Sequence, residues 1–166
     1  MINVYIINKS NNRNLSNYIL NYAYKDIYNK DIDLSKITKN SYGKPHYDDK
    51  FYYNISHSKN YIVIATSNKE IGIDIEEDRK YQELIKNKIL SEKEEIIDNN
   101  LIINWVIKEA YSKYKGIGYG MDFKIINTNV LLEDPNLKNI STSNYYCYIY
   151  GEGKINKIEI IKATTI

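Results

Sequence analysis

The chain has 166 residues, of which 43% are hydrophobic and 27% are charged. That length suffices for one compact domain, or for two small lobes that share a core. The 23 basic residues are interleaved with 21 acidic ones, and the net charge is only +2. Nucleic-acid-binding proteins usually carry a clustered basic stripe, so the composition argues against that class of partner.

The single cysteine, Cys147, excludes an intramolecular disulfide framework and favours a reducing compartment. The first ten residues are too short, and too interrupted by asparagine, for a signal peptide or a membrane span. The sequence therefore predicts a soluble, cytoplasmic protein that does not enter a membrane.

Hydrophobic periodicity and turn residues predict an α+β fold. The expected elements, in chain order, are a strand at 2–7, a helix at 14–29, strands at 51–55, 61–67 and 71–76, helices at 81–89, from Ser91, and at 101–115, and strands at 123–131, 144–150 and 154–161. Ser91 and Glu94 have the spacing of a capping box, which predicts the start of the helix at Ser91. The last two strands are expected to form a hairpin. The order β-α-β-β occurs twice, which suggests an internal duplication.

Two acids share one face of the strand expected at 71–76. Alternation places the three isoleucines on one face and Asp74 and Glu76 on the other. Carboxylates at this spacing can converge on a hard cation, and Mg²⁺ prefers oxygen ligands. The alternative is a solvated strand face with ordinary surface acids, and these two residues alone favour that alternative.

The helix expected at 101–115 carries a third acid. Trp105, Glu109 and Lys113 follow one another at intervals of four residues and therefore share a face. Glu109 and Lys113 can pair across one turn of the helix. The alternative is a surface ion pair beside a tryptophan of the core.

The segment N-I-S-H-S at 54–58 ends a strand with two hydroxyls around an imidazole. Ser56 and His57 can donate to phosphate, although a plain polar hairpin loop also accounts for them. Hydrolase chemistry is disfavoured because neither serine lies in a G-x-S-x-G elbow. The two histidines and one cysteine are too few for a zinc site.

The order of these motifs is more specific than any one of them. The series is G-K-P at 43–45, N-I-S-H-S at 54–58, G-I-D-I-E at 72–76, L-S-E-K-E at 90–94 and W-V-I-K-E-A-Y-S-K at 105–113. It strongly resembles the 4'-phosphopantetheinyl transferase superfamily, in the order found in the larger, pseudo-dimeric Sfp-type class. The resemblance covers residues 43–118 well.

The resemblance implies two similar α/β lobes related by a pseudo-twofold axis, with the active site between them. The N-terminal lobe would be residues 1–70, which would contact coenzyme A. The C-terminal lobe would be residues 71–166, with the metal site and the catalytic helix. A pseudo-dimer of this kind is expected to be a monomer.

The implied activity is Mg²⁺-dependent transfer of 4'-phosphopantetheine from coenzyme A to a serine of an apo acyl or peptidyl carrier protein, with release of 3',5'-adenosine bisphosphate. The residues that match the family's functional positions are Asp74, Glu76 and Glu109 as magnesium ligands, Glu109 also as general base, Lys113 as the group assisting the departing nucleotide, Lys44, Pro45, Ser56 and His57 as coenzyme A contacts, and Lys108 as a phosphate or carrier contact.

Two other functions remain open at this point. One is a non-catalytic coenzyme A or carrier-binding module of the same fold, against which the intact set of acids argues. The other is an unrelated magnesium-dependent phosphoesterase, which would hydrolyse nucleotides without a carrier. The N-terminal lobe lacks the dense basic cluster that grips the 3'-phosphate in relatives. The available substitutes are Arg13, Lys25, Lys30, Lys36 and Lys39.

Overall fold

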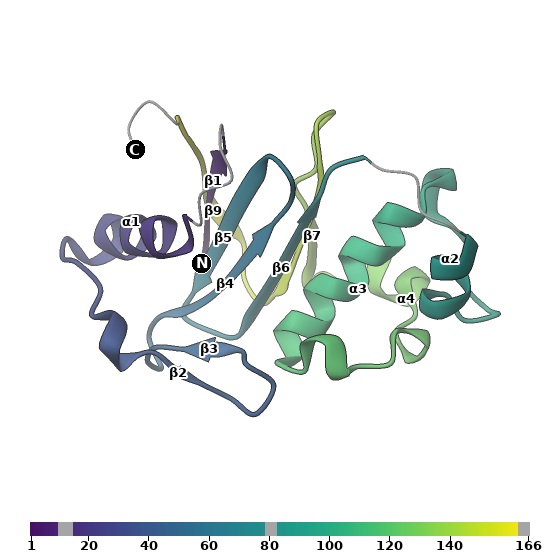
Figure 1. The fold of residues 1–166 in the computed structure, drawn as a ribbon, viewed down its shortest axis with the longest axis horizontal. Coiled ribbons are helices and arrows are strands. Elements are labelled where there is room, and N and C mark those ends of the chain that lie inside the picture. The colour runs from purple at the N-terminus through teal and green to yellow at the C-terminus, as the bar shows by residue number, and fades with distance from the viewer. Residues whose placement is uncertain (10–14, 79–82, 163–166) are drawn as a thin grey trace.

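The computed structural model describes residues 1–9, 15–78 and 83–162, except for the side chains of Glu83, Leu84 and Tyr119. In chain order the helices and strands are β1 (Ile2–Asn8), α1 (Ser16–Tyr28), β2 (Thr38–Lys39), β3 (Pro45–His46), β4 (Tyr52–His57), β5 (Tyr61–Ser67), β6 (Ile71–Glu76), α2 (Glu83–Ile89), α3 (Leu101–Lys115), α4 (Thr128–Leu132), β7 (Leu137–Asn139), β8 (Tyr146–Gly151) and β9 (Ile155–Ile161) (Figure 1). None of the helices in this part of the chain has the length and apolar character that a membrane span requires.

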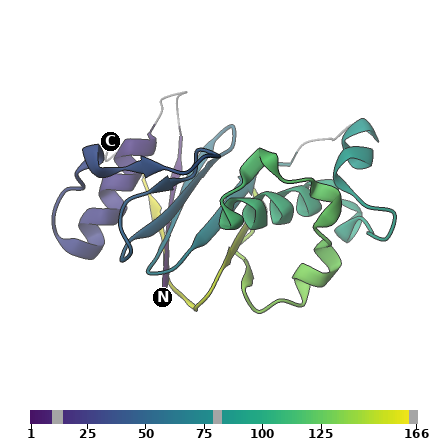
Figure 2. The ribbon, with the colours of Figure 1, turned by 90° about the horizontal axis from the view of Figure 1, so that it is seen from below.

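The elements form four layers. A four-stranded sheet, in the order β4-β5-β1-β9, packs on a three-stranded sheet, in the order β6-β8-β7. Helix α1 covers the outer face of the first sheet and α3 covers the outer face of the second (Figures 1 and 2). The α+β class predicted from the sequence is therefore confirmed.

Strand β1 is buried on both faces, and its sequence is apolar on both. Val4 and Ile6 point into the core between the two sheets, whereas Tyr5 and Ile7 point to α1. A strand that is covered on both faces has a continuous apolar run in place of an alternating one. The tyrosine hydroxyl still finds a partner, because it donates to Asp26 of α1 at 2.8 Å.

Helix α3 has the bounds that the sequence predicted. The Asn100 side chain caps its start by accepting from the backbone N–H of Ile102 at 3.1 Å. Gly116 ends it in the left-handed region, with φ 72°. Both ends are therefore fixed by residues whose capping preferences are readable from the sequence.

The predicted hairpin between residues 144–150 and 154–161 is wrong. Strand β8 pairs with β6 and β7, and β9 pairs with β1 in parallel. Strand β8 is buried on both faces, with Cys147 between the sheets and Tyr148 under α3, so it needs a central position. Strand β9 exposes one face and suits an edge. Residues 155–161 thus lie in the sheet of the N-terminal residues, although the prediction grouped them with 71–166.

Two further predictions fail in the C-terminal half. The strand expected at 123–131 is a 3₁₀ turn and the short helix α4, because Asn127 caps the backbone N–H groups of Asn129 and Val130. No α-helix starts at Ser91: residues 91–96 form a turn and extended chain. The Glu94 side chain does accept from the Ser91 N–H, but its other contacts are tertiary. Residues 81 and 82 of the predicted 81–89 helix lie outside the described residues.

Candidate functional site

The edges of the two sheets meet at β4 and β6, and side chains join them. Asn54 of β4 accepts from the backbone N–H of Ile73 at 2.9 Å. Ser56, two residues further along β4, donates its hydroxyl proton to Asp74 Oδ1 at 2.7 Å. Residues two apart on a strand share a face, so β4 presents both polar groups to β6.

Gly72 allows α3 to lie directly on β6. A Cβ at this position would stand 2.1 Å from the carbonyl oxygen of Ala110 and 2.4 Å from the backbone nitrogen of Tyr114. Only a residue without a side chain fits that approach. Asp74 lies two residues beyond Gly72 on the same face, and it therefore faces the side chains that α3 brings to the strand.

Lys113 of α3 reaches the buried acid of β6. Its Nζ lies 2.6 Å from Asp74 Oδ1 and 3.1 Å from Ser56 Oγ. Asp74 is only 5% exposed. Its second oxygen, Oδ2, is buried and accepts no hydrogen bond from any described residue. The sequence predicted that Lys113 could pair with Glu109; the ion pair that the structure gives for Lys113 is with Asp74.

Glu109 is the second buried acid of the site. It is 3% exposed, and its Oε1 likewise has no hydrogen-bond donor among the residues that the structure describes. Burial raises the pKa of Glu109 to about 7; Lys113 opposes this shift, whereas the negative charges of Asp74 and Glu76 add to it. The three predicted metal ligands thus share one electrostatic environment.

The three acids do not form a ready-made metal cage. Across residues 1–9, 15–78 and 83–162, no three acidic, histidine or cysteine side chains are grouped closely enough to hold an ion. The donor set nevertheless suits a hard cation, because Asp74 and Glu109 each keep one buried oxygen without a proton donor. The assignment of Mg²⁺ to Asp74, Glu76 and Glu109 stays a prediction.

His57 lies at the exposed end of β4, beside the start of α1. Its Nε2 is 3.0 Å from the hydroxyl oxygen of Ser16. Partial desolvation and the positive charges of Lys9 and Lys113 lower the pKa of His57. The ring is therefore placed where positive charges gather, which suits an anionic ligand, but its predicted contact with coenzyme A is untested.

The G-K-P segment packs against the end of α3. Asn40 holds its turn by accepting from the backbone N–H of Lys44 at 2.9 Å, and it donates to the carbonyl of Gly116 at 2.8 Å. The Lys44 ammonium bonds the Tyr114 carbonyl at 3.0 Å and also the Glu70 carboxylate. A pocket of about 190 Å³ opens here, and its lining is Tyr42, Gly43, Lys44, Pro45, Asn54, Lys113, Gly116 and Gly118. The predicted contacts Lys44 and Pro45 thus share one cavity with Lys113, whereas the predicted contacts Ser56 and His57 do not line it.

Lys108 does not serve the site in the way predicted. Its side chain is fully buried, and its Nζ donates to the carbonyls of Ile89 at 2.6 Å and Phe123 at 2.8 Å and to the Glu94 carboxylate at 2.7 Å. An ammonium has three protons, and all three are used. The prediction of a phosphate or carrier contact is corrected: Lys108 ties together three chain segments beside α3.

Sequence reasoning missed two residues that build the site. Gly72 belongs to the G-I-D-I-E motif, but the sequence does not show that the backbone of α3 packs directly against it. Asn54 is only the first residue of the N-I-S-H-S motif in the sequence, yet it joins two sheets. The signal for Asn54 was its spacing of two from Ser56, which puts both on one strand face.

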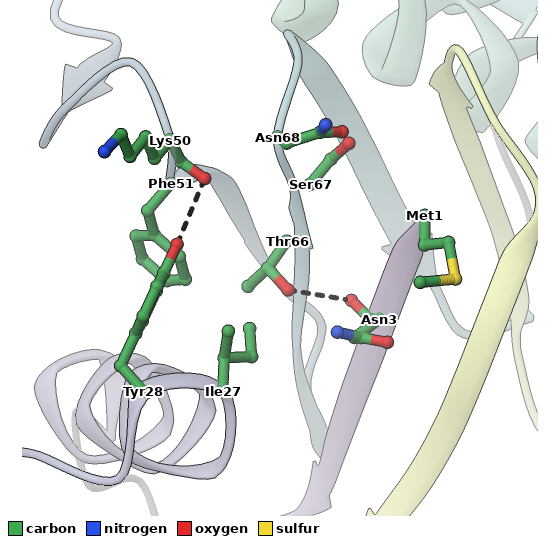
Figure 3. A pocket seen from close by; sticks show the side chains of 9 residues that line it. All are labelled: Met1, Asn3, Ile27, Tyr28, Lys50, Phe51, Thr66, Ser67 and Asn68. Carbon is green, nitrogen blue, oxygen red and sulfur yellow. Dashed lines mark hydrogen bonds between the residues drawn. The ribbon is translucent and has the colours of Figure 1, made fainter.

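A second pocket, of about 240 Å³, lies between the end of α1 and the first sheet (Figure 3). Two of the polar groups in its wall are bonded internally: Tyr28 donates to the Lys50 carbonyl at 3.2 Å and Thr66 to the Asn3 carbonyl at 3.4 Å. None of the residues predicted for function lines it.

Two curated proteins match parts of the chain. The 4'-phosphopantetheinyl transferase gsp of Aneurinibacillus migulanus is 39% identical over 92 residues, which are 50% of this chain and 38% of that protein. The L-aminoadipate-semialdehyde dehydrogenase-phosphopantetheinyl transferase of Candida glabrata is 29% identical over 112 residues, 56% of this chain and 43% of that protein. Each match spans less than half of the relative's length. No protein-family model matches the chain.

Proposed function

We propose that this chain, which is related to the 4'-phosphopantetheinyl transferase superfamily, transfers 4'-phosphopantetheine from coenzyme A to a serine of an apo carrier protein. The leaving product is 3',5'-adenosine bisphosphate, and the reaction depends on Mg²⁺. The two similar layers, α1 on the first sheet and α3 on the second, would correspond to the pseudo-twofold lobes of such an enzyme. A carrier of acyl or peptidyl type is the proposed partner.

One observation carries the proposal. Asp74 and Glu109, from different elements, each bury a carboxylate oxygen that accepts no hydrogen bond from the described residues. A buried polar atom without a partner is costly, and native proteins retain few of them. Such a pair beside a lysine is explained best by a ligand that supplies positive charge. Ordinary surface acids, the alternative left open by the sequence, would not be buried in this way.

Asp74, Glu76 and Glu109 would hold the magnesium ion. When bound, the ion would neutralise charge on the pyrophosphate oxygens and orient them. Asp74 is already fixed for that task, because Ser56 and Lys113 both bond its Oδ1 and leave Oδ2 available. Ser56 thus supports the site through Asp74, and a direct contact of its hydroxyl with coenzyme A remains part of the proposal.

Glu109 is the proposed general base for the carrier serine. A base works best when its pKa lies near the working pH, and burial raises the pKa of Glu109 to about 7. It would take the serine proton as the oxygen attacks the β-phosphorus. Lys113, already directed at the acids, would offer its ammonium protons to the departing phosphate.

The pocket beside Lys44 and Pro45 is the proposed binding place for one part of coenzyme A. Its volume of about 190 Å³ is below the roughly 300–1,000 Å³ usual for drug-sized ligands. Coenzyme A would therefore occupy it only in part, and the rest would extend over the surface near His57. Lys113 lines the pocket as well as the acid cluster, so the two parts of the site are continuous.

The decisive experiment incubates the purified chain with coenzyme A, Mg²⁺ and a panel of apo carrier proteins, and follows carrier mass. The proposal expects a gain of one phosphopantetheine that is lost when a chelator removes the metal. Nucleotide hydrolysis without any carrier would support the phosphoesterase alternative. Coenzyme A binding with no gain of mass on any carrier would support a non-catalytic module.

A further inference from the structure

Strand β9 forms one edge of the first sheet and exposes two isoleucines. Its neighbour on one side is β1, and within the described residues no strand pairs with its other side. Ile158 is 49% exposed and Ile160 is 67% exposed. An edge strand with apolar side chains is a template for pairing with another strand, and soluble proteins usually protect it.

The lysine that could protect this edge is held away from it. The Nζ of Lys157 lies 2.9 Å from Asp26 of α1 and 2.6 Å from Glu159, over the helix-covered face of the sheet. It also lies 5.3 Å from the ring centre of Tyr5. Lys157 is therefore held by acids of its own chain over the helix-covered face, and its ammonium does not shield the exposed isoleucines on the other face.

We propose that β9 is the interface of a homodimer, in which it pairs antiparallel with β9 of a second copy. A twofold axis through Ile158 would make one continuous sheet of the two four-stranded sheets. The interface would be isologous, with the same strand contributed by each copy. This proposal replaces the monomer expected from the sequence, and it does not rest on the proposed catalytic function.

The alternation of β9 selects this register. With Ile158 opposite its own copy, Lys157 of each strand faces Glu159 of the other, so both cross-strand charge pairs are complementary. An axis through Lys157 or through Glu159 would instead place like charges opposite each other. A slip by one residue would set a charge against an isoleucine and turn the apolar side chains to opposite faces.

The occupant that fits is therefore a second copy of the chain. In this arrangement Ile158 and Ile160 of both copies form one apolar strip on the face turned toward the second sheet. Ile158 packs against Ile158 of the other copy, and Ile160 lies opposite Asn156 and diagonal to Ile158 of the other copy, within reach across an antiparallel pair. A partner strand of another sequence would have to reproduce the same alternation of base, isoleucine and acid.

Cross-linking tests the register directly. Residues opposite each other in an antiparallel pair have Cα atoms roughly 4.5–5.5 Å apart, which permits a disulfide. Ile158→Cys should therefore form an intermolecular disulfide under mild oxidation. Ile160→Cys is the matched control: it is on the same face and more exposed, but it would lie about 13 Å along the strand from its own copy. The native Cys147 is buried and does not interfere.

We expect Ile158→Cys to cross-link about tenfold faster than Ile160→Cys, because a disulfide needs its Cα atoms within roughly 7 Å. Equal rates, or faster linking of the more exposed Ile160→Cys variant, would overturn the register. Sedimentation supplies the second measurement. The unmodified protein and Val130→Lys, an exposed apolar site on α4, should be dimeric, whereas Ile158→Lys should be monomeric. A monomeric unmodified protein, or a dimeric Ile158→Lys variant, would refute the interface.

Discussion

Glu109 is the residue at which burial and charge conflict most strongly. Its carboxyl group is almost completely buried, and the nearby carboxylates of Asp74 and Glu76 oppose its ionisation. The positive charge of Lys113 lowers the pKa of Glu109 but does not cancel the rise caused by burial and the two carboxylates, because the pKa still rises from 4.5 to about 7. The protein therefore keeps a carboxyl group that is costly to ionise, which points to a role other than stability.

The variant Glu109→Gln should separate the effect of Glu109 on catalysis from its effect on stability. Transfer to the carrier should fall by about 10²–10⁴-fold, the range for loss of a general base. Stability should change in the opposite direction. The folded pKa lies above the unfolded value, so the stability contributed by protonated Glu109 is lost as the pH rises from 4.5 to 7.

Glutamine cannot ionise and escapes that loss. In thermal melts without divalent metal, the melting temperature of the variant relative to that of the parent protein should increase as the pH rises from 4.5 to 7. If the difference in melting temperature between the variant and the parent protein did not change with pH, the pKa of Glu109 would not be raised in the folded protein. Near-normal transfer activity would remove Glu109 from the proposed chemistry.

His57 is the residue proposed to meet a phosphate from the N-terminal side. Replacing it with alanine should raise the apparent KM for coenzyme A by about 10- to 150-fold, because a hydrogen bond to a charged group contributes about 1.5–3 kcal/mol. The kcat should change little, since His57 is not proposed to move the serine proton. The exposed neighbour Lys59→Ala is the control. Initial rates over a coenzyme A series would give both constants, and an unchanged KM would reject the phosphate contact.

The sequence predicted which side chains of the site share a face better than it predicted which groups they contact. Alternation in β6 put Asp74 and Glu76 on one face, and the four-residue spacing in α3 put Glu109 and Lys113 on one face. Only the resemblance joined the strand to the helix, and the structure places Lys113 on Asp74. The spacing could not identify Lys108 as a core residue, because its burial depends on chain around residues 89–94 and 123 that packs over α3. A helical repeat defines a face, but the segment that covers this face is set by tertiary structure.

At the level of elements, the contact between β6 and α3 determines the site. Gly72→Ala would place a methyl group against backbone atoms at 2.1 and 2.4 Å, which cannot move like the end of a side chain. Overpacking typically costs about 1–3 kcal/mol, and this contact should lie at the upper end. Moving the helix would also separate Glu109 from Asp74, so activity should fall more than stability alone explains.

Gly151→Ala is the matched control for this change. Gly151 lies opposite Ile71 on β8, next to Gly72 in the sheet, and an added Cβ would stay at least 3.2 Å from its neighbours. Chemical denaturation and the carrier assay should distinguish the two variants. If both lose the same stability and activity, the close approach of α3 is not what positions Glu109.

The buried ion pair of Lys108 and Glu94 ties α3 to the chain segments packed beside it. Glu94 also accepts from the backbone N–H and the hydroxyl of Thr128, so its removal or that of Lys108 would leave buried polar groups unpaired. Lys108→Met should destabilise the protein by about 3–5 kcal/mol, the usual result of breaking a buried pair from one side.

The exposed Lys124→Met provides the control and should change stability by less than about 0.5 kcal/mol. Denaturant midpoints would measure both variants. A Lys108→Met variant that keeps its stability but binds coenzyme A weakly would restore the phosphate contact predicted from the sequence.

For the whole molecule, local pattern predicted elements well and connections poorly. Strands β5 and β6 and helix α3 have their predicted bounds, because each has its own periodicity and end signals. The partner of β9 could not be inferred in this way. A short turn after β8 favours a hairpin locally, yet β9 crosses to β1 because β8 is already flanked by β6 and β7.

That crossing links the two sheets into one cooperative structure. The chain starts in the first sheet, builds the second, and returns to the first as β9, while the apolar side chains of both sheets share one core. Unfolding of either sheet would expose that shared core. We therefore expect the protein to unfold in a single transition, as small domains usually do.

The only tryptophan makes this expectation testable. Trp105 lies on α3 against Phe123, with ring centres 5.5 Å apart, so its fluorescence reports on the second sheet and its helix. Ile19 belongs to α1 and is fully buried against the outer face of the first sheet. Ile19→Ala should cost about 2–5 kcal/mol, and it should shift the Trp105 fluorescence transition as far as the far-ultraviolet dichroism transition. If fluorescence kept its original midpoint while dichroism shifted, the two sheets would unfold independently, and β9 would not couple them.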